Sequence, residues 1–429
     1  MAQPRRHCDR RSKVAGVSAH KVKHLLIGGG LASANCARWL REAGGEGEIM
    51  VVGREPDPPY NRPPCSKGYL RGEESREETW FRPQEWWAEQ RIDLRTRTSV
   101  TKLDTTAKEA TLSNKEVISY ESALLATGAN VRRLNVEGCE LEGIHYLRTL
   151  GNSDAIRAEA GKRVVLIGGS YIGCEVAASL TKLGSSCAIV MQEAVTFQRG
   201  FGSQAGRFFQ ERLQEHGVQV HGEDELERFE GAGGRVSTVV TKGGLRLAAD
   251  AVVIGAGVTP DVTLARGAGL TLDDERSGVL CDSNLRSSAP GVWSAGDAAS
   301  YDSVVHGRRL RVEHWDVAFN QGKTAALNML GQDTPHEVIP YFFSDLADWA
   351  SLEYVGPAQS WDEEIVRGSF VDGKFSLWYL KDGRVLAALS VGRSEDLDHA
   401  RRLIAAGSRL GEERAALGEL DSELDALGR

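Results

Sequence analysis

The chain has 429 residues, of which 41% are hydrophobic and 26% are charged, and its formal net charge at pH 7 is −8. This composition is typical of a globular protein with sizeable buried cores and excludes a disordered chain. The acidic balance offers no basic face to a nucleic acid, no apolar run is long enough to span a bilayer, and the length predicts about three domains.

The first segment, residues 1–20, is basic and lacks the apolar core of a secretory signal, so we expect a disordered tail. The seven cysteines form no CxxC pair and their number is odd. This argues against a disulfide framework and against a zinc or iron–sulfur ligand set. We therefore expect no metal site and a reducing, cytoplasmic location.

An internal repeat predicts the architecture. Residues 24–40 (HLLIGGGLASANCARWL) and residues 164–180 (VVLIGGSYIGCEVAASL) each contain an apolar run, a Gly-rich turn and a helical pattern. A further apolar run follows each copy, at residues 49–52 and 188–191. The order strand, turn, helix, strand predicts two dinucleotide-binding units.

Both Gly-rich turns differ from GxGxxG by one residue. Serine takes the third glycine position in the first copy, as Ser33, and the second glycine position in the other copy, as Ser170. In this motif the glycines allow a tight turn, a close approach to a pyrophosphate and close helix packing. A serine is small, and its hydroxyl could donate to a phosphate held at the helix N-terminus. One site would hold a resident redox cofactor and the other a diffusible nucleotide, unless either is an ordinary turn without a ligand.

The segment after the first copy carries charged residues on a stiff loop. Glu55 follows the apolar run at residues 49–52, where a carboxylate can accept hydrogen bonds from both ribose hydroxyls of an adenosine. Four prolines stiffen residues 58–67 (PPYNRPPCSK). With Arg62 and Lys67, this loop could hold a pyrophosphate and a flavin, or it could be a rigid surface loop with solvated charges.

The run PPYNRPPCSKGYLRG, residues 58–72, resembles the FAD-dependent ferredoxin reductase and apoptosis-inducing factor-like branch of the pyridine nucleotide-disulfide oxidoreductases. Four further motifs match in order: LLATGA at residues 124–129, AGVTP at 256–260, GVWSAGD at 291–297 and VEHW at 312–315. The resemblance covers about residues 22 to 400. It implies an α/β fold with two Rossmann-like dinucleotide-binding domains, for FAD and NAD(P), the second inserted in the first, plus a C-terminal α+β domain.

The implied domain boundaries follow from the positions of these motifs. The FAD-binding domain would comprise residues 21–137 and 261–331, the NAD(P)-binding domain residues 138–260, and the C-terminal reductase domain residues 332–429. Leucines recur at helical spacing in the last twenty residues, which predicts an amphipathic helical tail. This tail would pack on its own domain, fray or mediate self-association, so a homodimer is left open.

The Gly-rich turns and the resemblance together imply the cofactor contacts. The expected FAD contacts are Gly28, Gly30, Leu31, Ala32, Ser33, Glu55, Arg62, Lys67, Val100, Ala126, Thr127, Gly128, Arg148, Gly296, Asp297, Glu313, His314, Trp315 and Phe343. The expected NAD contacts are Gly168, Gly169, Ser170, Tyr171, Ile172, Gly173, Glu175, Glu193, Ala256 and Gly257.

The resemblance also implies particular roles. Asp297 would hydrogen-bond the ribityl chain, because a carboxylate is a pure acceptor for hydroxyls. Trp315 would lie against the flavin ring, although a buried Trp is more often part of a core. Lys67 and Glu175 would form a catalytic pair near the flavin that orients the nicotinamide. Phe343 stands where the family commonly has Trp.

The nucleotide preference is predicted from the residues after the apolar run at 187–191. An NADH site favours an acid at this point, and an NADPH site favours an arginine. Glu193 stands slightly late in the sequence, and Arg199 is the nearby base. We expect NADH, with NADPH the less favoured nucleotide.

The expected reaction passes a hydride from NADH to FAD and then electrons to a separate iron–sulfur carrier, a [2Fe–2S] ferredoxin or a rubredoxin. Two alternatives are open. Cys65 stands where the branch usually has Leu, and a thiolate beside Lys67 would make the protein a peroxide or disulfide reductase, unless Cys65 is a small buried hydrophobe. The protein could instead be an NADH-sensing flavoprotein, similar to apoptosis-inducing factor, with a protein partner.

Overall fold

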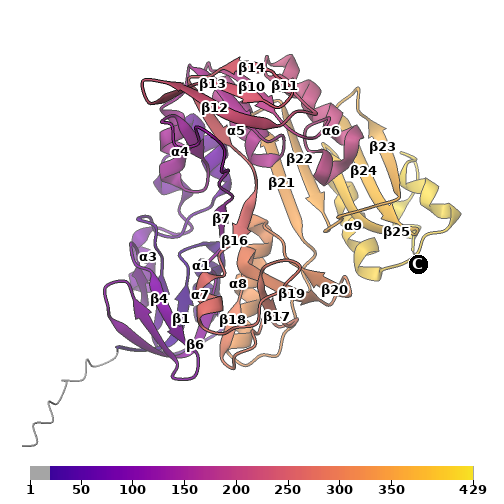
Figure 1. Cartoon of the computed structure of the whole chain (residues 1–429). Helices are drawn as coiled ribbons and strands as arrows, with labels where there is room; N and C mark the ends of the chain where they lie inside the picture. The colour runs from indigo at the N-terminus through magenta and orange to yellow at the C-terminus, as the bar shows by residue number, and fades with distance from the viewer. Residues whose placement is uncertain (1–19, 429) are drawn as a thin grey trace, which may run out of the picture.

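The structure, a computed structural model, describes residues 20–428, which form two units built on parallel strands and a C-terminal antiparallel sheet (Figure 1). The predicted fold class is confirmed. The expected tail, residues 1–20, lies outside the described residues except for His20, where the first strand begins. Within the described residues, no helix is long and apolar enough to cross a membrane.

The first unit is built on a seven-stranded sheet with the path β3–β2–β1–β6–β5–β4, in which β18 also pairs with β6. The strands β1, β2, β3, β6 and β18 are parallel, and the pairs β4–β5 and β5–β6 are antiparallel. The strand bounds are β1 (His20–Ile27), β2 (Ile49–Val52), β3 (Ile92–Arg95), β4 (Val100–Asp104), β5 (Glu109–Leu112), β6 (Val117–Leu125) and β18 (Val292–Ser294).

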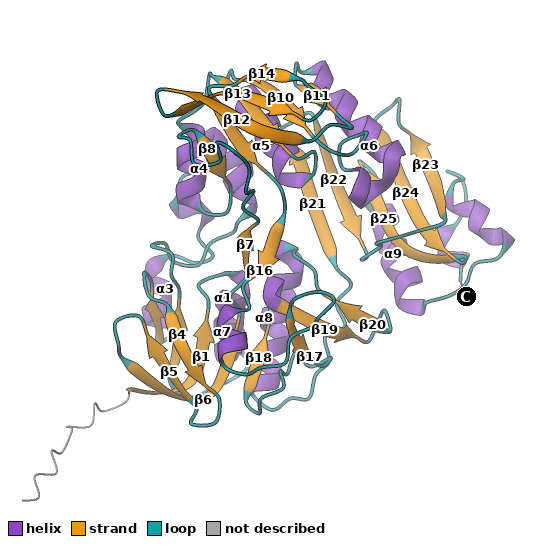
Figure 2. Cartoon of the chain, viewed as in Figure 1, coloured by secondary structure: helices purple, strands orange, loops and turns teal. Residues whose placement is uncertain are grey.

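Two helices far apart in the sequence pack side by side on this sheet (Figure 2). They are α1 (Leu31–Glu42) and α8 (Trp315–Met329). A small sheet lies in the same part of the chain, with the order β17 (Val279–Cys281), β19 (Ala299–Ser303) and β20 (Arg308–Leu310). The short helices of the unit are α2 (Gly68–Arg71), α3 (Gln84–Glu89) and α7 (Thr263–Gly267). The first unit therefore combines an early and a late stretch of the chain.

The second unit has a five-stranded parallel sheet in the order β11–β10–β9–β15–β8. The bounds are β8 (Ile144–Tyr146), β9 (Arg163–Ile167), β10 (Ser186–Val190), β11 (Gln219–His221) and β15 (Ala251–Ile254). Its helices are α4 (Leu150–Arg157), α5 (Tyr171–Lys182) and α6 (Gln198–Glu215), and a small antiparallel sheet joins β12 (Leu226–Ala232), β13 (Arg235–Thr241) and β14 (Arg246–Ala248). The strands β7 (Ala129–Val131) and β16 (Val258–Pro260) pair where the chain enters and leaves this unit.

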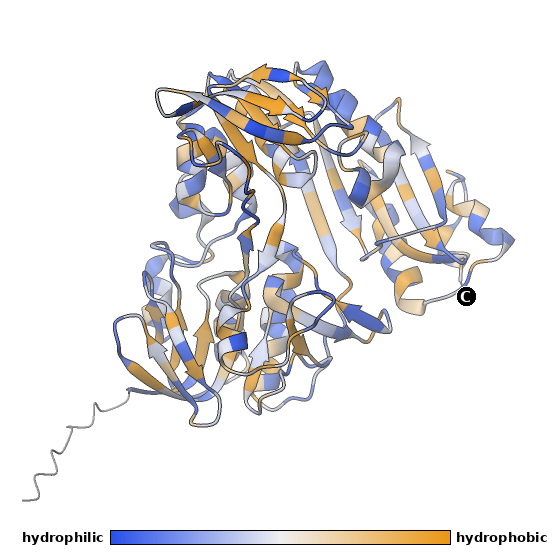
Figure 3. Ribbon diagram, viewed as in Figure 1, coloured by the Kyte–Doolittle hydropathy of each residue, from blue (hydrophilic) through white to orange (hydrophobic). Residues whose placement is uncertain are grey.

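The C-terminal unit is an antiparallel sheet in the order β21–β22–β25–β24–β23, next to the helix α9 (Glu395–Ala406). Its strands are β21 (Tyr341–Leu346), β22 (Ala350–Val355), β23 (Glu363–Ser369), β24 (Lys374–Lys381) and β25 (Arg384–Val391). Hydrophobic residues concentrate in the strands of the sheets, whereas the helices carry more hydrophilic residues (Figure 3). Burial of these strand faces supplies the main stabilising term of each core.

The predicted amphipathic helix at the C-terminus is wrong. Two 3₁₀-helices replace it, at Glu412–Leu417 and Leu424–Ala426. The buried guanidinium of Arg367 donates to backbone carbonyls of this segment, including that of Leu420 at 3.0 Å, and Gly418 ends the first 3₁₀-helix. Most of the expected leucines are nevertheless buried against the C-terminal sheet, while Leu420 is 58% exposed. The leucine spacing therefore reflects packing of an irregular tail on its own domain.

Candidate active site between two Gly-rich loops

A cavity of about 820 Å³ lies where the three units meet. Most of the residues expected to contact FAD line it: Gly28, Gly30, Leu31, Ala32, Glu55, Arg62, Lys67, Val100, Ala126, Thr127, Gly128, Arg148, Gly296, Asp297, Glu313, His314, Trp315 and Phe343. From the second Gly-rich turn and its surroundings, Ser170, Tyr171, Ile172, Glu175 and Gly257 line the same cavity. The volume is within the range of protein sites for small molecules and cofactors.

The first Gly-rich turn connects β1 to α1 at one wall of the cavity. Gly28 has φ +121°, and a Cβ at this position would lie 2.1 Å from the carbonyl oxygen of Ala126, so the turn requires glycine. A Cβ on Gly30 would meet no protein atom within 4 Å, although Gly30 lines the cavity. No side chain caps the first turn of α1. The backbone N–H groups of this turn are therefore available to an anionic group in the cavity.

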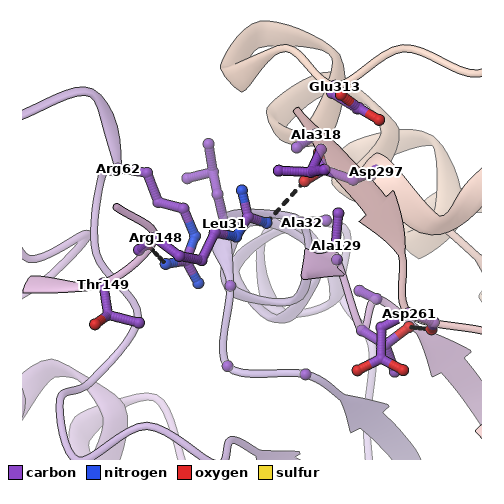
Figure 4. Close-up of a pocket in the computed structure, with 18 of the residues that line it drawn as sticks. Leu31, Ala32, Arg62, Ala129, Arg148, Thr149, Asp261, Asp297, Glu313 and Ala318 are labelled. Carbon is purple, nitrogen blue, oxygen red and sulfur yellow. Dashed lines mark hydrogen bonds and ion pairs between the residues drawn. The ribbon is translucent and has the colours of Figure 1, made fainter. Parts of the chain in front are cut away.

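Arg62, Arg148 and Asp297 lie along this wall (Figure 4), and Glu55 lines the same cavity. Arg62 pairs with Glu55 at 2.6 Å, and Arg148 pairs with Asp297 at 2.8 Å. The Tyr60 hydroxyl also donates to Glu55, at 2.6 Å. Burial alone would raise the pKa of Glu55, but the charge and the hydrogen bond of Arg62 outweigh it and hold this pKa below its usual value. Glu55 is therefore ionised at neutral pH and retains lone pairs for hydroxyl donors.

These features fit a dinucleotide such as FAD. The cavity is long enough to reach from Glu55, at the end of β2, to Phe343, on β21. It offers uncapped helix amides and the guanidinium groups of Arg62 and Arg148 to phosphates, and carboxylates to hydroxyls. A Cβ on Gly30 would project into the space beside those amides.

Lys67 and Glu175 form an ion pair, and both side chains are almost fully buried. The hydroxyls of Ser66 and Ser344 each donate to the Glu175 carboxylate at 2.5 Å. The ammonium of Lys67 lies 5.9 Å from the ring centre of Phe343. The pair thus joins the stiff loop, helix α5 and strand β21, and the four groups hold one another in a single arrangement.

The second Gly-rich turn connects β9 to α5. A Cβ on Gly173 would lie 2.0 Å from the carbonyl oxygen of Gly168, and Gly168 itself has φ +108°. These glycines allow close packing of the turn rather than contact with the cavity, because neither lines it. Ser170 precedes the first residue of α5 and lines the cavity, and its side chain makes no capping hydrogen bond.

Some expected contacts lie away from the cavity. Ser33 is fully buried, its hydroxyl has no hydrogen-bond partner among the described residues, and it does not line the cavity, so the expected hydroxyl–phosphate contact is corrected here. Ser33 lies in the first turn of α1, a helix that packs against α8. Gly168, Gly169, Gly173, Glu193 and Ala256 also lie outside the lining. Glu193, which follows β10, forms an ion pair with Arg199.

Cys65 does not have the properties of a reactive thiol. Its side chain is buried in an apolar cluster and does not line the cavity, although its neighbours Ser66 and Lys67 do. Burial raises the pKa of the thiol to about 12, and the nearby charge of Arg62 only partly opposes this shift. The reductase alternative needs a thiolate at Cys65, but Lys67 does not contribute to lowering this pKa, and the thiol is neutral at pH 7. The structure favours the small-hydrophobe interpretation.

Replacing Cys65 with alanine should leave NADH-driven electron transfer within about twofold of the wild-type rate, because the thiol is inert and outside the cavity. The measurement is steady-state turnover with a ferredoxin, together with NADH oxidation in the presence of peroxide. Cys139, which is partly exposed, offers a matched control as Cys139→Ala. Loss of a peroxide-linked activity in Cys65→Ala, but not in the control, would restore the redox role.

Several lining residues were missed from the sequence, among them Ser66, Thr149 and Asp261. Thr149 begins α4 in a capping box with Asn152, a local pattern that could have been recognised. Asp261 has no such local signal, because only the return of the chain through β16 brings it to the cavity, where Arg54 pairs with it at 3.1 Å. Tyr341 and Phe342 line the cavity beside Phe343, as expected from the aromatic run at residues 340–343.

Comparisons with known proteins agree with this geometry. Residues 22–322 match the family described as pyridine nucleotide-disulphide oxidoreductase, and residues 341–426 match the family described as reductase C-terminal. The chain is 33% identical to rhodocoxin reductase of Rhodococcus erythropolis, with 93% of each chain covered. It is 33% identical to the ferredoxin–NAD(+) reductase component of the anthranilate 1,2-dioxygenase system of Burkholderia cepacia, covering 90% of this chain and 94% of that one. The crystal structure of the covalent putidaredoxin reductase–putidaredoxin complex matches with a TM-score of 0.88 at 31% identity, covering 94% of this chain and 97% of that chain.

Proposed function

The chain belongs to the pyridine nucleotide-disulphide oxidoreductase family, and we propose that it is an FAD-dependent enzyme that takes a hydride from NADH and passes electrons to a separate [2Fe–2S] ferredoxin. Bound FAD would supply the redox chemistry, because it accepts two electrons from a nicotinamide and can release them singly. The observation that carries the proposal is that both Gly-rich loops open into one cavity, with Lys67 and Glu175 paired between them.

The domain assignment is part of this proposal. Residues 21–137 and 261–331 bind FAD, residues 138–260 bind the nicotinamide nucleotide, and residues 332–429 form the C-terminal domain that closes the cavity. The sheet order supports it, because β18 completes the first sheet after the chain has returned through β16. The lining contributed by β21 supports the role of the C-terminal domain.

The chain's own groups would hold FAD at both ends. The N-terminal amides of α1 and the guanidinium groups of Arg62 and Arg148 bind the pyrophosphate. Glu55 accepts hydrogen bonds from ribose hydroxyls, and Asp297 accepts them from the ribityl chain. The uncapped helix and the two ion pairs at these positions support this orientation.

At the other end of the cavity, the protein supplies position rather than covalent chemistry. The Lys67 ammonium lies beside Phe343 and faces the region where the two bound rings would meet. Glu175 holds the ammonium in place, and the hydroxyls of Ser66 and Ser344 hold Glu175. Fixed charges and a fixed ring contact reduce the entropy cost of hydride transfer. Trp315 contacts Phe319 in a stacked pair at 5.2 Å and completes the wall.

We propose NADH as the preferred nucleotide. Glu193 follows β10, where a carboxylate can accept both hydroxyls of the adenosine ribose. Arg199, the base that could bind the extra phosphate of NADPH, is paired with this carboxylate. The relative from Burkholderia cepacia, whose name specifies NAD(+), supports the same preference.

Replacing Glu193 with alanine should raise the KM for NADH by about tenfold and narrow the preference over NADPH, because the ribose loses its acceptor and Arg199 is released. Steady-state kinetics with both nucleotides measure this change. Arg207→Ala is the control, because Arg207 is an exposed arginine on α6, the helix that carries Arg199. This variant should change neither KM. If Glu193→Ala has the same ratio of kcat/KM for NADH to kcat/KM for NADPH as the wild type, Glu193 does not contact the nucleotide.

The partner is proposed from the relatives and from the chain's composition. An iron–sulfur ferredoxin is supported by two relatives named as ferredoxin-linked or redoxin-linked reductases and by the matched complex. Rubredoxin as acceptor, a homodimer and a cytoplasmic location remain predictions; the cysteines of the described residues are all free, which supports a reducing compartment.

The test is reconstitution of electron flow. FAD-loaded protein, NADH and a [2Fe–2S] ferredoxin should reduce cytochrome c at a rate that depends on the ferredoxin concentration. Slow turnover with every acceptor, together with NADH-dependent association of the protein, would instead favour the sensor interpretation.

A further inference from the structure

Helix α6 is broken after its first turn, close to the second Gly-rich loop. Gly202 has φ 77° and ψ 177°, which separates the turn at residues 198–201 from the rest of the helix. A Cβ on Gly202 would lie 2.3 Å from a carboxylate oxygen of Glu364, so the break needs glycine both for its backbone conformation and for space.

The C-terminal sheet provides hydrogen bonds to the broken helix. The hydroxyl of Tyr379, on β24, donates to the backbone carbonyl of Phe201 at 2.9 Å. Tyr379 is fully buried and Phe201 is 1% exposed. On the other side of the break, Glu364 accepts hydrogen bonds from Trp361 at 2.7 Å and from Gln204 at 2.8 Å. Because a buried carbonyl without a donor is costly, the Tyr379 hydroxyl stabilises the first turn in this position.

The first turn of α6 also contacts the second Gly-rich turn, between β9 and α5. The backbone N–H of Phe197, just before α6, donates to the carbonyl of Gly169 at 2.7 Å. The rings of Phe197 and Phe201 contact the ring of Tyr171 at centroid distances of 5.7 and 5.8 Å. Tyr171 lines the cavity at the start of α5. A continuous set of contacts therefore runs from the core of the C-terminal sheet to the wall of the cavity.

We propose that Tyr379 is a positioning residue for the nicotinamide nucleotide: its hydroxyl holds the first turn of α6, and that turn fixes the Gly-rich loop and the ring of Tyr171. This inference rests on the proposed function, in which the second loop binds NADH. The first Gly-rich turn, which would bind FAD, is not part of this set of contacts. Loss of the Tyr379 hydroxyl should therefore weaken binding of the nicotinamide nucleotide and not of FAD.

The chain offers a matched pair of variants. Tyr379→Phe removes the donor and keeps the ring. Tyr354→Phe is the control, because Tyr354 is buried in the same aromatic cluster, 5.2 Å from Phe201 and 6.0 Å from Tyr379 between ring centres, and its hydroxyl makes no hydrogen bond to α6.

Calorimetric titration of the FAD-loaded protein with NAD+ measures binding directly. Tyr379→Phe should raise the Kd for NAD+ and the KM for NADH by about tenfold, with kcat at saturating NADH and the FAD content unchanged. Tyr354→Phe should match the wild type in all four quantities.

The outcomes separate this inference from the proposed function. A wild-type protein that binds no NAD+ contradicts the proposed function itself. If the wild type binds NAD+ and Tyr379→Phe lowers the melting temperature but binds NAD+ equally well, Tyr379 is merely structural and the inference is overturned. An equal loss of affinity in Tyr354→Phe would also overturn it, because the loss would then come from the cluster and not from the hydrogen bond.

Discussion

Replacing Lys67 with alanine should slow the reduction of bound FAD by NADH by about 100-fold, while FAD stays bound. The physical reason is the position of the ammonium, which is buried beside Phe343 and paired with Glu175. A fixed charge in a site that excludes water stabilises charge redistribution far more than the same charge in solvent. In the proposed function, FAD retention would depend instead on the N-terminal amides of α1 and on Arg62 and Arg148, which line the same cavity.

Stopped-flow absorbance under anaerobic conditions measures this rate, and the absorbance ratio of the purified protein measures the FAD content. Lys182→Ala is the control, because Lys182 lies at the end of the same helix as Glu175 in an ion pair with the exposed Asp348, 2.8 Å away. Exposed pairs of this kind contribute little. Glu175 keeps its hydrogen bonds from Ser66 and Ser344 in the Lys67 variant, which favours retention of the fold. Reduction of Lys67→Ala at the wild-type rate would exclude the proposed role.

Replacing Gly30 with valine should yield a folded protein with FAD affinity lowered by about 100-fold or more. Gly30 has φ −98° and ψ −176°, an extended conformation that valine adopts readily. Its Cβ would meet no protein atom, so the added side chain would occupy the part of the cavity next to the uncapped amides of α1. The expected contact of the pyrophosphate with those amides would be blocked.

The measurement is FAD content after reconstitution, with the melting temperature and NAD+ binding as controls for the fold and for the second loop. The variant is expected to be colourless, to melt within a few degrees of the apoprotein and to bind NAD+. A yellow variant with normal FAD affinity would show that the cofactor does not lie against this turn.

The fold and much of the site could be predicted because local sequence patterns encode them. The repeat of apolar run, Gly-rich turn and helix correctly indicated two units built on parallel strands. The pattern can be recognised in the sequence because the tight turns leave space only for glycine at positions such as Gly28 and Gly173. The family resemblance predicted the pair of Lys67 and Glu175, which are far apart in sequence and form an ion pair in the structure.

Other features depend on tertiary contacts that no local pattern reports. The serine at position 344 reaches Glu175 only because the C-terminal sheet docks on α5. In the 3₁₀-helix Pro63–Ser66, Cys65 is turned into an apolar cluster while Ser66 lines the cavity, so adjacent residues have opposite environments. In the C-terminal tail, the leucine spacing predicted a helix. The guanidinium of Arg367 instead donates hydrogen bonds to the backbone carbonyls of Leu420 and Ser422, which a helix would pair with its own N–H groups.

The central claim is that this chain binds FAD in the cavity and reduces it with NADH. Anaerobic titration of the FAD-loaded protein with NADH, followed by absorbance, tests it most directly. The account predicts a yellow protein that bleaches with about one equivalent of NADH and passes the electrons on when a [2Fe–2S] ferredoxin and cytochrome c are added. A protein that remains colourless after reconstitution with FAD, or a flavin that NADH does not bleach, would contradict it.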